Sequence, residues 1–110
     1  MAMELLSKRE EQILLAIGNL GANAYLVAIK KHLSEVTGHN LSIGAVHIPL
    51  RRLEKESIIE SGLGEATAIR GGRRKKIYRL TPKALDALKE SKRVHDILWN
   101  NFTAFALKQG

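Results

Sequence analysis

Apolar residues recur at helical spacing near the start of the chain. Residues three and four apart lie on the same face of a helix, so these positions form one apolar stripe. Ser7-Lys8-Arg9-Glu10 fits a capping box in front of the stripe, and Gly21 can adopt the left-handed conformation that ends helices. The pattern therefore predicts a first helix that begins at Ser7 and ends near Gly21. The stripe consists of Ile13, Leu14, Ile17 and Leu20.

A second stripe with the same spacing predicts a second helix. Asn23 can cap its start, because an asparagine side chain accepts hydrogen bonds from free amides, and Gly38 can end it. The remaining face is polar, as expected for a helix with one side in water. The stripe consists of Leu26, Ile29, Leu33 and Val36.

A third predicted helix begins at the cap Ser42 and has two chemically different faces. Successive residues turn by about 100° around the axis, which separates an apolar face from a basic one. Pro49 lacks an amide hydrogen and clashes with the preceding turn, so we expect either a kink or a later helix start. The apolar face carries Val46, Leu50 and Leu53, and the opposite face carries Gly44, Ile48, Arg51 and Lys55, with Arg52 beside them.

Short strands and glycines follow the third helix. A first strand is expected to begin over residues 58–60 and to be interrupted by Gly62 and Gly64. Further strands over residues 66–70 and 76–80 should flank Gly71-Gly72, which supplies a turn with positive φ. The pattern predicts a β-hairpin after the third helix.

A last helix is predicted to begin at Thr81-Pro82, a cap followed by proline at the first helical position, where its missing amide does no harm. Apolar residues continue at helical spacing to about Leu107. The fold class predicted is mainly α with a small β-hairpin (α+β), with one domain over the whole chain. The stripe of the last helix includes Leu85, Leu88, Val94, Leu98, Phe102 and Phe105.

The positive charge of the chain is concentrated in the predicted hairpin. The net charge is +7, and six of the 18 lysines and arginines lie in the ten positions 70–79. The rest of the chain contains 12 basic and 11 acidic residues, so its charges nearly balance. Such a local cluster favours a polyanionic partner, and a helix followed by a basic hairpin is the plan of a winged helix, in which the helix enters a DNA groove.

Composition narrows the other possibilities. The chain has no cysteine, which rules out disulfides and thiolate metal sites. The first twelve residues contain no apolar core long enough for a signal peptide, and no apolar run reaches membrane-spanning length, so we expect a cytoplasmic protein without membrane partners. Catalytic patterns such as His-Glu-x-x-His and Gly-x-Ser-x-Gly are missing, and no cofactor is predicted.

Several motifs in the right order carry a family resemblance, which spans about residues 41–88. The chain resembles the PadR family of bacterial winged-helix transcriptional regulators. The family usually has tyrosine where His47 stands and glycine near Ser57, and Pro49 also departs from its pattern. The motifs are Ser42-Ile43-Gly44-Ala45-Val46, Leu50-Arg51-Arg52-Leu53-Glu54, Glu65-Ala66-Thr67-Ala68 before Arg70, Gly71-Gly72-Arg73-Arg74-Lys75-Lys76 and Tyr78-Arg79-Leu80-Thr81-Pro82.

The resemblance implies a homodimer built through the terminal helices, DNA binding by helix and wing, and repression as the usual outcome. Some members release double-stranded DNA when they bind a small aromatic effector near the dimer interface. We therefore expect a winged-helix region over residues 1–81 and a C-terminal dimerisation helix over residues 82–110. The expected function is a sequence-specific repressor that binds a palindromic operator.

The candidate DNA-binding residues lie on the basic helix face and the hairpin. Four residues are expected in the groove, namely Arg51, Lys55, His47 and Ile48. The wing cations, defined as Arg73, Arg74, Lys75 and Lys76, are expected to contact phosphates or a minor groove. The wing cations should project from the hairpin tip with no apolar neighbour. The full set is Ser42, His47, Ile48, Arg51, Arg52, Lys55, Arg70, Arg73, Arg74, Lys75 and Lys76.

Alternatives stay open for both the partner and the aromatic residues. The fold could bind structured RNA or an acidic protein, and a cluster of surface cations could simply be solvated. Trp99 could bind an effector, or it could belong with Phe102 and Phe105 to a dimer core, and the two roles are compatible.

Overall fold

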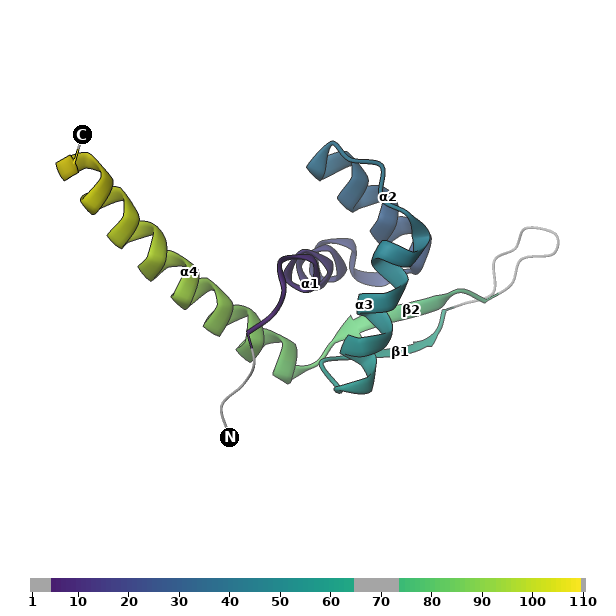
Figure 1. Ribbon diagram of the computed structural model, residues 1–110. Helices are drawn as coiled ribbons and strands as arrows, with labels where there is room; N and C mark the ends of the chain where they lie inside the picture. The colour runs from purple at the N-terminus through teal and green to yellow at the C-terminus, as the bar shows by residue number, and fades with distance from the viewer. Residues whose placement is uncertain (1–4, 65–73, 110) are drawn as a thin grey trace.

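The computed structural model describes residues 5–64 and 74–109, and it is mainly α-helical with one two-stranded hairpin (Figure 1). This architecture confirms the predicted fold class. The elements in chain order are α1 (Lys8–Leu20), the short 3-10 helix η1 (Gly21–Asn23), α2 (Leu26–Thr37), α3 (Ile43–Lys55), β1 (Ile59–Leu63), β2 (Lys76–Leu80) and α4 (Pro82–Gln109).

The predicted capping box starts α1. The Ser7 hydroxyl accepts from the Glu10 amide at 3.1 Å, and the Ser7 amide donates to the Glu10 carboxylate at 2.8 Å. Gly21 follows the helix with a backbone φ of +56°, which residues other than glycine rarely adopt. The predicted start at Ser7 and the end before Gly21 are confirmed, but the ψ of −121° at Gly21 differs from the left-handed conformation that was expected.

The predicted start of α2 is wrong. Asn23 lies in η1, and α2 begins at Leu26 after Tyr25, whose side chain makes no capping hydrogen bond. The intervening Ala24 is buried, and its carbonyl accepts from the Tyr78 amide at 2.8 Å, so this segment is tied to β2. Val36 was expected in the apolar stripe but is 70% exposed.

Ser42 caps α3 as predicted, with its hydroxyl accepting from the Ala45 amide at 3.1 Å. α3 begins at Ile43 and continues through Pro49. Of the two expected effects of Pro49, the later helix start is therefore wrong. After the helix, Ser57 has φ of +61°. A positive φ is a conformation that glycine adopts most easily, so the backbone at Ser57 is strained.

The hairpin pairs β1 with β2 in an antiparallel register that joins Ile59 to Leu80 and Leu63 to Lys76. Gly62 lies inside β1, so the expectation that glycines interrupt this strand is wrong there. The predicted strand at 66–70 and the Gly71-Gly72 turn lie outside the described residues.

The junction between the hairpin and α4 is held by Thr81. Its hydroxyl donates to the carbonyl oxygens of Ser57 and Ile58, which lie 2.9 and 2.8 Å away. Pro82 is the first residue of α4, as predicted. These hydrogen bonds place the start of α4 beside the exit turn of α3.

One apolar core lies between α1, α2, α3 and the hairpin, and the first turns of α4 complete it. Apolar stripes make these helices amphipathic, and burying the stripes is the main force that holds them together. The largest fully buried side chains are Ile13, Leu14, Ile29, Val46, Leu50, Leu53 and Ile59.

Beyond its first turns α4 extends away from the core, on the side opposite the hairpin (Figure 1). Ala84 and Ala87 are buried, whereas Leu85, which was predicted in the apolar stripe, is 52% exposed. The Ser91 hydroxyl donates to Glu11 of α1 at 2.8 Å. Over residues 5–64 and 74–109, no helix combines the length and apolar character needed to cross a membrane.

Candidate nucleic-acid interface

The outward face of α3 and the base of the hairpin enclose a hollow of about 690 Å³. This hollow brings together all four predicted groove residues with one lysine of the predicted wing. Ser42 is exposed at the start of the same helix. The lining residues are His47, Ile48, Arg51, Arg52, Glu54, Lys55 and Lys76.

The chemistry of the hollow follows from the two faces of α3. Val46 and Leu50 point into the core and are fully buried, which turns Arg51 and Lys55 outward. Ile48 is 70% exposed on this basic face. Exposed cations next to an apolar side chain suit a DNA groove, where cations meet base edges or phosphates and apolar groups meet thymine methyls.

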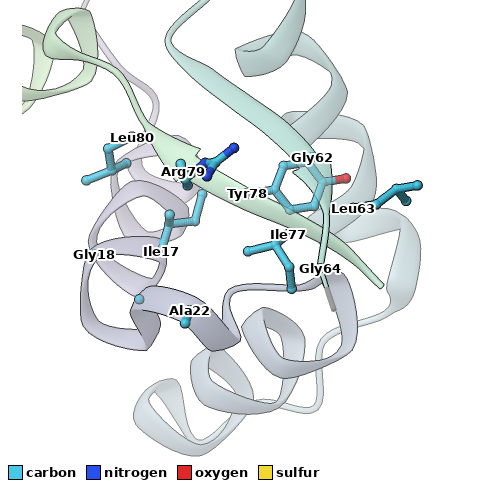
Figure 2. A pocket seen from close by; sticks show the side chains of 11 residues that line it. Ile17, Gly18, Ala22, Gly62, Leu63, Gly64, Ile77, Tyr78, Arg79 and Leu80 are labelled. Atoms are coloured by element: carbon cyan, nitrogen blue, oxygen red, sulfur yellow. The ribbon is translucent and has the colours of Figure 1, made fainter. Parts of the chain in front are cut away.

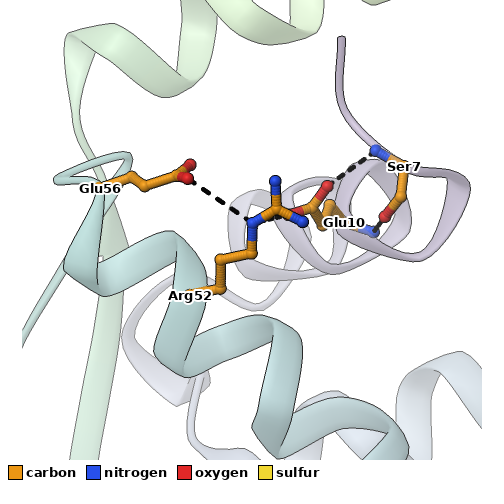
Figure 3. A network of polar contacts seen from close by, with 4 residues as sticks. All are labelled: Ser7, Glu10, Arg52 and Glu56. Atoms are coloured by element: carbon orange, nitrogen blue, oxygen red, sulfur yellow. Dashed lines mark hydrogen bonds and ion pairs between the residues drawn. The ribbon is translucent and has the colours of Figure 1, made fainter. Parts of the chain in front are cut away.

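Arg52 also ties α3 to α1 (Figure 3). Its Nε lies 3.6 Å from a Glu10 carboxylate oxygen and 3.5 Å from one of Glu56. Glu10 is only 5% exposed, and its other oxygen accepts from the Ser7 amide. A buried carboxylate needs partners, so Arg52 stabilises the packing of α3 on α1 in addition to lining the hollow.

Glu54 binds the base of the hairpin. One carboxylate oxygen is 3.1 Å from the Lys76 Nζ, and the other accepts a hydrogen bond from the Ser61 hydroxyl of β1. The Ser61 hydrogen bond and then Lys76 lower the pKa of Glu54, and the hydrogen bond with Glu54 raises the pKa of Lys76. Both groups are therefore charged at neutral pH.

Lys75 does not project freely. Its Nζ lies 3.9 Å from the centre of the Tyr25 ring at the start of α2, a cation–π geometry. The expectation that the wing cations have no apolar neighbour is thus wrong for Lys75, and Lys76 is engaged by Glu54. Arg74 is exposed, while Arg70 and Arg73 lie outside the described residues.

Three residues of this region were not predicted from the sequence, namely Tyr25, Glu54 and Ser61. Glu54 follows the predicted basic face directly, and its acidity in a basic setting was the one local signal that could have identified it. Its partner Lys76 is 22 positions away, so the pairing depends on how the hairpin packs against α3.

An apolar hollow of about 300 Å³ lies on α4, lined by Leu98, Trp99 and Phe102. The rings of Trp99 and Phe102 meet edge to face, with centroids 5.9 Å apart, and His95 lies on the other side of Trp99 at 6.2 Å. All three lining residues are more than half exposed. A contiguous apolar surface of this kind marks a protein contact or a ligand site.

A third hollow, of about 880 Å³, lies between the end of α1 and the hairpin. Figure 2 shows Ile17 and Ala22 facing Ile77 across it. It shares no lining residue with the hollow on α3. None of the predicted site residues lines it.

Comparisons with known proteins agree on one family. The family model described as "Transcriptional regulator PadR-like family" matches residues 13–90. No curated protein matches the chain.

Solved structures give further similarities. A PadR-like transcriptional regulator from Bacillus cereus is 29% identical with a TM-score of 0.71, over 92% of this chain and 91% of that one. A PadR family transcription regulator from Clostridium difficile is 26% identical with a TM-score of 0.65, over 87% and 97%. A PadR family transcriptional regulator from Eggerthella lenta, 23% identical with a TM-score of 0.68 over 89% and 83%, shares the fold.

Proposed function

Since the chain belongs to the PadR-like family of transcriptional regulators, we propose that it is a repressor that binds a palindromic DNA operator as a dimer. The observation that carries the proposal is the basic hollow between α3 and the base of the hairpin. In a winged helix, a helix with this exposed basic face lies in the major groove and the wing contacts the adjacent backbone.

Arg51 and Lys55 are proposed to contact the groove. Both are exposed on α3, and Arg51 can bind guanine through two hydrogen bonds. His47, half-buried in the hollow, can donate to a base edge or a phosphate, and Ile48 can contact a thymine methyl. The wing residues Arg70, Arg73, Arg74, Lys75 and Lys76 are proposed to contact phosphates or a minor groove.

The dimer is proposed to form through α4. Leu98, Trp99 and Phe102 form an apolar surface on which each side chain is more than half exposed, and α4 extends far from the core (Figure 1). A second copy placed by a two-fold axis would bury the same surface on both subunits. This arrangement would also set two α3 helices at a fixed separation, as a palindromic operator requires.

A small aromatic effector is proposed to bind beside Trp99. The edge-to-face contact with Phe102 leaves the hollow on α4 apolar, and planar ligands stack on such rings. Planar aromatic compounds should therefore quench Trp99 fluorescence and weaken DNA binding. Unchanged fluorescence and DNA affinity across a panel of such compounds would limit Trp99 to a packing role.

Selection of bound fragments from genomic DNA by the purified protein tests the proposal. We expect enrichment of a short palindromic motif, and we expect Arg51→Ala to lose that enrichment. Arg93→Ala is the matched control, because it removes the same side chain from an exposed site on α4, where it pairs with Glu90. Tight binding to structured RNA without any enriched DNA motif would contradict the proposal.

A further inference from the structure

An acidic residue lies within the basic hollow. Glu54 lines it together with Arg51, Arg52, Lys55 and Lys76, and among the described lining residues it is the one carboxylate. A negative charge at this place should repel DNA phosphates. A carboxylate on a surface proposed to bind DNA therefore needs a functional explanation as well as a structural one.

The two oxygens of Glu54 are held by donors that also suit a phosphate. Lys76 approaches one oxygen at 3.1 Å, and the Ser61 hydroxyl donates to the other. Lysine ammonium groups and serine hydroxyls are common donors to phosphate oxygens in protein–DNA complexes. In the free protein the carboxylate thus occupies two donors at the junction of α3 and the hairpin, where a DNA backbone would pass.

We propose that Glu54 acts as an internal substitute for a DNA phosphate, which holds Lys76 and Ser61 in the free protein and lowers the affinity for DNA of any sequence. The proposal rests on the proposed DNA-binding function. An incoming phosphate takes over Lys76 and Ser61 and leaves the carboxylate without these partners.

The exposure of the pair makes this exchange feasible. The side chains of Lys76 and Glu54 are 52% and 32% exposed, so water can solvate both groups when they separate. Ion pairs that are open to solvent are weak, which allows a phosphate to replace the carboxylate without a large loss of protein stability. A deeply buried pair would instead be a fixed part of the fold.

Glu54→Gln tests the proposal, because it removes the charge and keeps the shape. Removing one charge near a phosphate should tighten binding on the order of fivefold per protomer, on operator and random duplexes alike. Glu54→Ala should tighten binding in the same direction. Thermal melting of each variant checks that the fold is kept.

A matched control is available on the same strand. Glu60→Gln makes the same change of charge in β1, next to Ser61, and successive strand residues point to opposite faces, so Glu60 points away from Glu54. We expect Glu60→Gln to change DNA affinity much less than Glu54→Gln. Equal effects of the two variants would show a general charge effect and overturn the proposal.

A double-mutant cycle with Lys76 separates competition from positioning. If Glu54 occupies Lys76, then Lys76→Ala should weaken DNA binding more in the Glu54→Gln background than in the wild type. Additive effects, or weaker DNA binding by Glu54→Gln itself, would overturn the proposal and make Glu54 a positioning residue. Wild-type protein that binds no duplex even at low salt would contradict the proposed function instead, so the two failures are distinguishable.

Discussion

The Nζ of Lys75 lies 3.9 Å from the centre of the Tyr25 ring, which joins the base of the hairpin to the start of α2. The next residue, Lys76, pairs with Glu54 of α3 at 3.1 Å. Two adjacent lysines therefore hold the hairpin to two different helices. These contacts link the base of the hairpin to the start of α2 and to α3 in the free protein.

Replacing Lys75 and Lys76 together by alanine should weaken binding to all DNA sequences alike. In a dimer the double variant removes up to four cationic contacts, so the slope of log affinity against log salt should become shallower by roughly two to four. Salt titrations on operator and random duplexes measure this. An unchanged slope would mean that neither lysine neutralises a phosphate.

Lys75→Ala alone should be slightly less stable than the wild type. A cation over an exposed aromatic ring contributes about 0.5–1 kcal/mol, and Lys75→Ala removes that contact with Tyr25. Urea unfolding of Lys75→Ala and of the control Lys31→Ala, an exposed lysine on α2, gives the comparison. Equal stability of the two variants would show that the ring contact adds nothing in solution.

Neighbouring arginines on α3 should behave differently. Arg52→Ala leaves the buried Glu10 carboxylate without its cation and should cost roughly 1–2 kcal/mol of unfolding free energy. Arg51→Ala is the matched control: it should change stability by less than about 0.5 kcal/mol while it impairs operator binding. Denaturant unfolding and DNA titration of both variants test this contrast, which equal stabilities would contradict.

Phe102→Asp should convert a dimer into a folded monomer. The side chain is 63% exposed within one chain, so a charge there leaves the core intact and disrupts only a contact with a second copy. Asn100→Asp places the same charge at another exposed position of α4 and serves as the control. Sedimentation velocity distinguishes the outcomes, and a Phe102→Asp protein that remains dimeric would exclude this surface as the interface.

Ser61→Ala should raise the pKa of Glu54, because the Ser61 hydrogen bond is the largest cause that lowers it. A carboxyl with a lowered pKa stabilises the fold above its unfolded value near 4.5, and this stability is lost as the pH falls through the folded value. The variant should therefore lose less stability between pH 7 and acid pH than the wild type. NMR titration of the Glu54 carboxyl measures the shift directly, and an identical pKa in both proteins would refute it.

Local signals in the sequence predicted much of the fold. The Ser7–Glu10 box and the Ser42 cap are contacts three residues apart, so the chain reveals them directly. Asn23 failed as a cap because the Ala24 carbonyl accepts from Tyr78 of β2, a tertiary contact that local preference does not contain.

The site was predictable only as far as one helix face determines it. The outward positions of α3, such as Ile48 and Arg51, follow from helical spacing and meet in one hollow. The partners of Lys75 and Lys76 come from helices far away in the sequence. Only the packing of the hairpin against α2 and α3 brings them together.

Footprinting the purified protein on a selected DNA fragment tests whether the protein binds a palindromic operator as a dimer. Two α3 helices related by a dimer axis should protect two inverted half-sites whose centres are about one helical turn, roughly 34 Å, apart. Arg51→Ala should lose both half-sites, while Arg93→Ala should keep them. A single half-site without an inverted repeat, or protection that Arg51→Ala does not change, would contradict the account.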